Sequence, residues 1–409
     1  MKDYLPQITK YLFLLTVLLL PSYLIRFSFF GLPTNVLEVL AGISILLLFL
    51  EKKQLLFLDW KNICHQFRFP LVLLFLGLLL SFFANKFSLD SLGIIKGWFV
   101  APFLFSISLP LIFKEEKDVR KLLEWLYFSI SWVAIVSLGY KFFNIVTYDG
   151  RLTSFYLSPN HLAMYLAPGF FIGTYLIKNP VNKKYLFFLS ALLIFIASAF
   201  YFTFSYGAWL SVFLSFALLF FIGKDFILKK NVLVLSALIL FVFFVFQINN
   251  PKLSFLDNPR SSLSSRMMIW DSGLKIIKDN PFFGIGPGNF QNKYLEYQKF
   301  FLPYLEWAVP QPHNIYLAFW LQAGILGLLG FLILCSHWIY LQIKQKNAAE
   351  TTVFLGIFLY ILLHGLIDTP YWKNDLAFVF WITFFLSPRK FKTSDTKAIA
   401  GDTVFRRFC

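Results

Sequence analysis

Residues 314–341 read NIYLAFWLQAGILGLLGFLILCSHWIYL, a run without a single Asp, Glu, Lys or Arg. A helix needs roughly 20 apolar residues to cross a bilayer, so this run predicts a membrane-spanning helix. A backbone in hydrocarbon must satisfy its own hydrogen bonds, and the short alternating segments of a membrane barrel are missing from this sequence. Similar runs give about twelve predicted spans in total, the others lying near 11–30, 35–50, 69–84, 92–113, 122–143, 160–177, 184–201, 207–222, 232–248, 351–367 and 375–387.

The composition agrees with an all-α polytopic membrane protein. Hydrophobic residues make up 58% of the chain and charged residues only 14%, which is too apolar for a soluble domain of this length. The net charge of +16 comes from basic residues in short loops between the runs, a pattern of membrane topology rather than of nucleic-acid binding.

Basic residues gather in alternate loops, which places both termini in the cytoplasm. The opposite short loops carry only scattered ones, such as Lys86, Arg151 and Lys373. The cytoplasmic set comprises Lys52, Lys53, Lys61, Arg68, Lys114, Lys117, Arg120, Lys121, Lys178, Lys183, Lys184, Lys224, Lys229, Lys230, Lys344, Lys346, Arg389, Lys390 and Lys392.

The predicted organisation has four parts. Residues 1–248 hold the first nine spans, residues 249–312 form a long extracytoplasmic loop, residues 313–388 hold the last three spans, and residues 389–409 form a cytoplasmic tail. A loop of this length with structure of its own is usually functional.

Helices are also predicted inside the long loop. Ser264–Asp279 has an amphipathic pattern in which Met267, Trp270, Leu274 and Ile277 share one face. Asn280-Pro281 ends this helix, and a second short helix is expected over 290–302. Between them lies a glycine turn containing Gly284, Gly286 and Gly288, which is either a phosphate cradle or an ordinary tight turn.

Two polar residues of the outer side are candidates for chemistry. His313 opens the span at 314–341, where the positive end of the helix dipole favours the neutral imidazole that a general base requires. The alternative is an interfacial histidine that caps the helix. Arg266, with Arg260 upstream, offers a guanidinium that can bind a phosphate group through two hydrogen bonds, and a solvated helix face is the alternative.

Further candidates lie at the outer ends of other spans. Arg151 precedes the sixth span and either binds substrate or extends to the membrane surface. His364 and Asp368 lie one turn apart at the end of the eleventh span, where ionisable groups either function or pair for packing. There is no Asp-x-Asp pair and no His/Cys cluster, so neither a metal nor another cofactor is expected.

Several motifs together resemble the O-antigen ligase and polymerase superfamily of bacterial envelope glycosyltransferases. The resemblance extends over about residues 145–385, and the His-Asn-x9-Gly-x-x-Gly pattern beside a long outer loop is most similar to the ligase branch. The motifs are Arg151-Leu-Thr-Ser-Phe, Ser158-Pro159-Asn160-His161-Leu-Ala163, Arg266-Met-Met-Ile-Trp270, Asn280-Pro281-Phe-Phe-Gly284-Ile-Gly286-Pro-Gly288-Asn289-Phe290 and His313-Asn314-(nine residues)-Gly324-Ile-Leu-Gly327.

The resemblance implies a metal-independent, inverting transfer of an O-antigen glycan from undecaprenyl diphosphate to a sugar hydroxyl of the lipid A–core. The enzyme would lie in the inner membrane with its site facing the periplasm. His313 would be the base, assisted by Asp368, and Arg266 would bind the diphosphate together with Arg151 and Arg260. Further substrate contacts are expected from Asn314, Tyr206 and His364.

One position departs from the family pattern. Many members have Ser-Arg-Gly where this chain has Ser205-Tyr206-Gly207, so a diphosphate ligand is missing there. Arg151, Arg260 or Lys275 could replace it, and the sequence does not choose among them. Two other functions also remain open: a polymerase that uses a second lipid-linked glycan as acceptor, and a lipid or solute transporter with ionisable residues along a path through the membrane.

Overall fold

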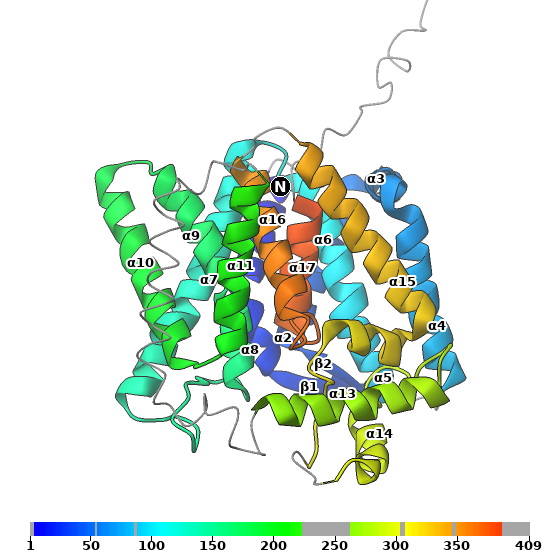
Figure 1. Ribbon diagram of the computed structural model, residues 1–409. Helices are drawn as coiled ribbons and strands as arrows, with labels where there is room; N and C mark the ends of the chain where they lie inside the picture. Colours follow the sequence, from blue (N-terminus) through cyan, green and yellow to red (C-terminus); the bar gives the residue numbers. More distant parts are fainter. Residues whose placement is uncertain are drawn as a thin grey trace, which may run out of the picture.

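The computed structural model describes residues 4–53, 55–85, 88–222, 262–302, 307–345 and 349–386, and this part of the chain is mostly helical (Figure 1). The longer helices run side by side in one bundle, and α13 lies across one end of it. The bundle helices are α1 (Leu5–Leu18), α2 (Val36–Lys52), α3 (Leu55–Cys64), α4 (Arg68–Ala84), α5 (Leu89–Ile94), α6 (Ala101–Ile112), α7 (Glu116–Phe142), α8 (Pro159–Leu166), α9 (Pro168–Lys178), α10 (Lys183–Phe202), α11 (Tyr206–Phe221), α15 (Ile315–Lys344), α16 (Ala349–His364) and α17 (Asn374–Leu386).

The helical, membrane-embedded character predicted from the composition is confirmed. Five helices of the described part are long and apolar enough to cross a membrane: Asp59–Ala84, Leu89–Ile112, Glu116–Phe142, Lys183–Phe202 and Ile315–Lys344. Shorter apolar helices are Leu5–Leu18, Tyr206–Phe221, Ala349–His364 and Asn374–Leu386. The total of about twelve spans stays a prediction, since the run at 232–248 and the tail at 389–409 lie outside the described residues.

The first predicted span is wrong at its C-terminal end. Instead of one helix over 11–30, α1 ends at Leu18, a 3-10 turn η1 (Leu20–Leu24) follows, and β1 (Arg26–Phe29) pairs antiparallel with β2 (Leu32–Asn35). Pro21 cannot supply the N–H that would continue the helix. Phe30 and Gly31 both have positive φ, 49° and 77°, the geometry of a two-residue hairpin turn. The hairpin is a small addition to the predicted all-α fold.

The glycine-rich side of α15 packs closely against α4. A Cβ on Gly77 of α4 would lie 2.2 Å from the backbone nitrogen of Gly327, and one on Gly330 would lie 2.4 Å from that of Leu74. Small residues at such positions let two membrane helices approach backbone to backbone. Gly327, the second glycine of the His313–Gly327 motif, lies in this contact.

Gly324, the first glycine of that motif, breaks α15. Its φ of 68° and ψ of −178° are not helical. The loop segment 282–285 occupies the break: the Ile325 N–H donates to the Phe282 carbonyl at 3.0 Å, and the Ile285 N–H donates to the Leu321 carbonyl at 2.7 Å. A Cβ on Gly284 would lie 2.3 Å from the Leu321 carbonyl oxygen, so only glycine fits. The glycine turn therefore fastens the loop to α15 and is not built as a phosphate cradle.

The two loop helices are present as α13 (Ser262–Asp279) and α14 (Phe290–Tyr297), the latter followed by a 3-10 turn (Gln298–Phe300). On the predicted apolar face of α13, Met267 and Leu274 are 54% and 52% exposed, whereas Ile277 is buried. The buried side chains of α13 are Ser265, Met268, Ile269, Ser272, Ile276 and Ile277. Met268, Ile269, Ile276 and Ile277 join Ile285, Phe290, Tyr294, Val309 and Leu321 in a second apolar core between α13, α14 and α15.

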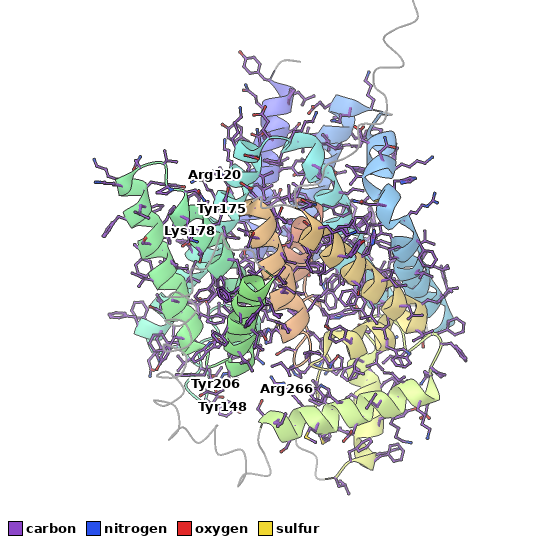
Figure 2. All side chains as sticks on the ribbon, turned by 45° about the horizontal axis from the view of Figure 1, so that its top comes forward. Arg120, Tyr148, Tyr175, Lys178, Tyr206 and Arg266 are labelled. Atoms are coloured by element: carbon purple, nitrogen blue, oxygen red, sulfur yellow. The ribbon has the colours of Figure 1, made fainter. Side chains whose placement is uncertain are left out.

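The hairpin, α13 and α14 lie at one end of the bundle, which we call the site face, and α3 lies at the opposite end (Figure 1). Figure 2 shows the same division: Tyr148, Tyr206 and Arg266 gather at one end, and Arg120, Tyr175 and Lys178 at the other.

Candidate active site

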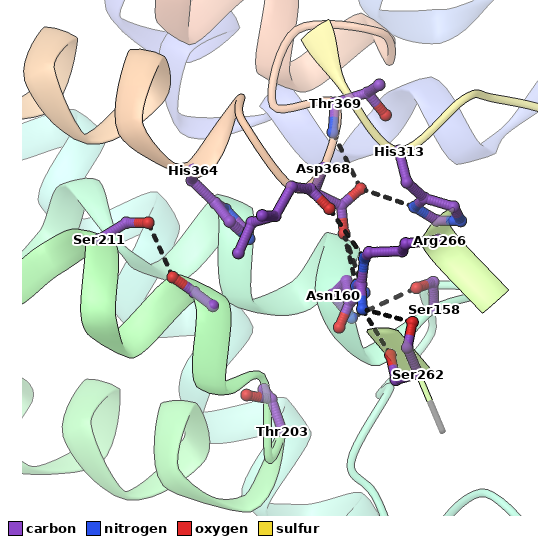
Figure 3. Close-up of polar contacts among 12 residues, drawn as sticks. Ser158, Asn160, Thr203, Ser211, Ser262, Arg266, His313, His364, Asp368 and Thr369 are labelled. Atoms are coloured by element: carbon purple, nitrogen blue, oxygen red, sulfur yellow. Dashed lines mark hydrogen bonds and ion pairs between the residues drawn. The ribbon is translucent and has the colours of Figure 1, made fainter. Parts of the chain in front are cut away.

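A buried carboxylate, that of Asp368, is the centre of a polar cluster on the site face (Figure 3). Asp368 lies in the 365–373 connection between α16 and α17 and is 2% exposed. Its Oδ1 lies 3.1 Å from His313 Nδ1 and accepts the Thr369 N–H at 2.9 Å. Its Oδ2 accepts a hydrogen bond from Asn160 Nδ2 at 2.9 Å and lies 3.7 Å from Arg266 Nη2.

These neighbours keep Asp368 ionised. Burial by itself would raise the pKa of Asp368, but His313, Arg266 and His364 together hold that pKa well below its usual range. An ionised carboxylate only accepts hydrogen bonds, so the facing Nδ1 of His313 carries its proton toward Asp368. The lone pair of the neutral imidazole is then on Nε2, the nitrogen that does not face Asp368.

His313 is held by its backbone as well as by Asp368. Its φ is 47°, an uncommon value for a residue with a side chain. Trp270 of α13 donates from Nε1 to the His313 carbonyl at 3.2 Å. The His313 side chain is 31% exposed, so the imidazole is supported from one side and accessible from the other.

Arg266 of α13 contacts the 365–373 segment that carries Asp368. Its Nε donates to the Ile367 carbonyl at 2.9 Å, and its Nη1 donates to the Ser262 hydroxyl. The Arg266 side chain is 20% exposed. The guanidinium is thus oriented by α13 and by the residue before Asp368, with part of its surface open.

Asn160 joins Arg151 to this cluster. Arg151 donates from Nη2 to Asn160 Oδ1 at 2.6 Å and from Nε to the Thr203 carbonyl at 2.8 Å, while the Asn160 amide donates to Asp368. Burial lowers the pKa of Arg151 and the nearby Arg266 adds to this, against Asp149 and Asp368. Asn160 was not among the predicted site residues, although it stands in the Ser158–Ala163 motif.

The remaining predicted residues take different places. The Asn314 side chain caps α15 by accepting the N–H groups of Tyr316 and Leu317, and it donates to the Leu366 carbonyl at 3.0 Å. The interfacial capping that was the alternative for His313 is therefore performed by its neighbour. His364 is buried and its Nδ1 lies 2.9 Å from the Tyr360 hydroxyl. Arg260 lies outside the described residues.

Tyr206 begins α11 on the site face and interacts electrostatically with Arg151. Lys275 of α13 is another possible substitute for the missing arginine. Its Nζ lies 4.9 Å from the centre of the ring of Phe300, which belongs to the 3-10 turn after α14. Of the two substitutes that lie within the described residues, Arg151 is the one that the structure joins to the Asp368 cluster.

The cluster brings an imidazole together with two guanidinium groups. Arg151 and Arg266 both lie near Asp368, and Asp149 also acts on Arg151. The described residues contain no group of three or more His, Cys, Asp or Glu side chains that could hold a metal ion.

Comparison with known proteins bears on this arrangement. Residues 191–332 match the family model described as O-Antigen ligase. The chain is similar to O-antigen ligases. The matched stretch contains Tyr206, Arg266 and His313, whereas Arg151, Asn160 and Asp368 lie outside it.

The resemblance to the O-antigen ligase and polymerase superfamily is thereby confirmed. A protein of Haemophilus influenzae (strain ATCC 51907 / DSM 11121 / KW20 / Rd), described as uncharacterized, is 26% identical over 160 residues. That alignment covers 34% of this chain and 39% of the relative.

Proposed function

We propose that this protein is an O-antigen ligase of the bacterial inner membrane, with its site face in the periplasm. It transfers a glycan from undecaprenyl diphosphate to a sugar hydroxyl of the lipid A–core. The observation that carries the proposal is the His313–Asp368 pair, 3.1 Å apart, beside two guanidinium groups. A base and a diphosphate-binding pair are the two functions that this transfer requires.

The base acts on the acceptor. As the acceptor oxygen forms its bond to the anomeric carbon of the donor, His313 Nε2 takes the hydroxyl proton. Asp368 holds the ring through Nδ1 and stabilises the imidazolium that forms. Attack opposite the leaving group inverts the anomeric configuration.

The guanidinium groups act on the donor. The bond between the anomeric carbon and the diphosphate oxygen breaks, and its electron pair stays on the diphosphate. Arg266 and Arg151 stabilise the negative charge that develops there, and Arg151 takes the place of the arginine that Tyr206 replaces. Tyr206 and His364 lie close enough to shape the site without supplying that charge.

The same machinery would serve a polymerase, whose acceptor is a second lipid-linked glycan, and glycan profiling of a deletion strain separates the two. We expect full-length polymer to accumulate on the undecaprenyl carrier while the lipid A–core stays unmodified. Accumulation of single repeats on the carrier would assign the polymerase reaction instead. A normal profile would reject both.

A further inference from the structure

A second cationic pair, Arg26 and Lys373, lies on the site face outside the Asp368 cluster. Arg26 opens β1, and Lys373 is the residue immediately before α17. The turn η1, which leads into β1, packs against α17. The two positive side chains are therefore brought to the same edge of the bundle from opposite ends of the sequence.

Two carboxylates in this part of the fold, those of Asp375 and Glu38, already have other partners. Asp375 is fully buried, and both its oxygens lie 3.1 Å from His161 Nε2. Glu38 forms an ion pair with Lys96 at 2.8 Å and accepts hydrogen bonds from Asn35 and Asn374. Asp375 therefore faces His161 as well as Lys373, and Glu38 is paired with Lys96.

Asp375 is the carboxylate that acts on Lys373 among the described residues. The Lys373 side chain is half-buried; burial lowers the pKa of its ammonium and Arg26 lowers it further, while Asp375 raises it. The Arg26 guanidinium lies 5.8 Å from the centre of the Tyr23 ring, and the Tyr23 hydroxyl lies 3.5 Å from His161 Nε2. Two like charges thus share the single carboxylate of Asp375, which His161 also contacts, an arrangement that an anion would stabilise.

The two cationic sites are neighbours. Asn160 and His161 are consecutive at the start of α8, and the first contacts Asp368 while the second contacts Asp375. Lys373 and Asp368 belong to the same connection between α16 and α17. A group bound at Arg26 and Lys373 would therefore lie beside the reacting groups without competing for Arg266 and Arg151.

We propose that Arg26 and Lys373 form a second anion site, which binds a phosphate group on the acceptor glycolipid. This inference rests on the proposed function, in which Arg266 and Arg151 are occupied by the diphosphate of the donor. A phosphate monoester carries nearly two negative charges at neutral pH, which matches two cations. An anionic phospholipid headgroup has the same chemistry, so the test must separate the two sources.

The test measures binding in the absence of donor. The full-length protein, in nanodiscs of phosphatidylcholine, is titrated with phosphorylated lipid A–core and with the same glycolipid after phosphatase treatment. Lys373→Gln and Arg26→Gln are compared with a control, Lys141→Gln. This control removes a cation from the last turn of α7, where the Lys141 Nζ lies 5.1 Å from the centre of the Phe202 ring. Phosphatidylglycerol nanodiscs form a parallel series.

We expect Lys373→Gln and Arg26→Gln each to raise the Kd of the phosphorylated acceptor by roughly tenfold or more, as for the loss of a charge-assisted hydrogen bond. Lys373→Arg and Lys141→Gln should bind as the parent does, and the phosphatase-treated acceptor should bind all variants equally weakly. The unfolding temperature should not fall, since removing one of two like charges relieves repulsion.

Unchanged acceptor binding in both Gln variants would overturn the proposal, as would an equal loss in Lys141→Gln. A change seen only with phosphatidylglycerol would assign the pair to a lipid headgroup and also reject it. A parent protein that binds phosphorylated acceptor through Lys373 but transfers no glycan would leave the anion site standing and refute the ligase function.

Discussion

At His313, a left-handed backbone and the proposed base are combined in one residue. The φ of 47° places an extra demand on any substitution, and asparagine tolerates this region better than alanine does. His313→Asn is therefore the better test of the base. A positioned base contributes about 10²–10⁴-fold, so the transfer rate in a reconstituted assay should fall by that factor while donor binding stays unchanged.

His313→Ala provides a second variant and circular dichroism a folding control. Transfer by His313→Asn within a few-fold of the parent would remove the base assignment. An equal loss of donor binding and transfer would make His313 a diphosphate ligand instead.

Arg266 tests the donor side. A charge-assisted hydrogen bond is worth roughly 1.5–3 kcal/mol, so Arg266→Ala should lower kcat/KM for the donor by one to two orders of magnitude. Arg266→Lys should restore only part of this, because lysine keeps the charge but loses the planar fork of donors. Near-normal transfer by Arg266→Ala would place the diphosphate elsewhere.

Asn160 should act as a positioning residue, because it holds Arg151 with its oxygen and Asp368 with its amide. Asn160→Ala should lower the rate by roughly tenfold through these two lost bonds. Asn160→Asp should be worse, since a second carboxylate would then face Asp368. Asn179→Ala, on the opposite face, is the matched control, and equal rates for Asn160→Asp and the parent would contradict the role.

The sequence identified these residues unevenly. His313 and Arg266 stand out because His313 opens an apolar run and Arg266 lies in a motif of the loop helix. The contact of Asp368 with His313 depends on how the 365–373 connection folds back over the start of α15, which no local pattern encodes. Asn160 is an ordinary turn residue until both its partners are located.

At the scale of elements, the break in α15 should be the most sensitive backbone feature. Gly324→Ala would force an L-residue into φ 68°, with its Cβ 2.5 Å from the Phe282 carbonyl oxygen. Backbone strain of this kind costs about 1–3 kcal/mol before the collision is counted. We expect a clear drop in unfolding temperature in detergent and loss of activity.

Gly139→Ala in α7 is the control, because nothing lies within 4 Å of a Cβ added there. A Gly324→Ala protein as stable as Gly139→Ala would show that the break can close into a regular helix. That result would contradict the structural role given to the 282–285 segment.

Elements were predicted well where hydropathy alone decides and less well where a turn lies inside an apolar run. The hairpin at 26–35 was missed because Phe27, Phe29 and Phe30 extend the hydrophobic run of the first span. Helical spacing gives α13 two apolar stripes, and which of them is buried within the protein depends on α14 and α15.

For the whole molecule, the site face should lie outside the cytoplasm. In a background without Cys64, Cys335 and Cys409, Tyr148→Cys on the site face should react with a membrane-impermeant maleimide in intact cells. Val181→Cys, in the exposed connection between α9 and α10 at the opposite face, should react only after the inner membrane is permeabilised. The reverse pattern would invert the topology and exclude a periplasmic ligase.

The junction between the loop and α15 has a consequence for how this sequence can vary. Its two hydrogen bonds, Ile325 to Phe282 and Ile285 to Leu321, run from main chain to main chain. Such a junction depends on spacing and on two glycines rather than on the identity of the other side chains. The turn could therefore tolerate many substitutions at Phe282 and Phe283, both exposed. A single inserted or deleted residue between Pro281 and Ile285 would shift the register and uncouple α13 from the helix that carries His313.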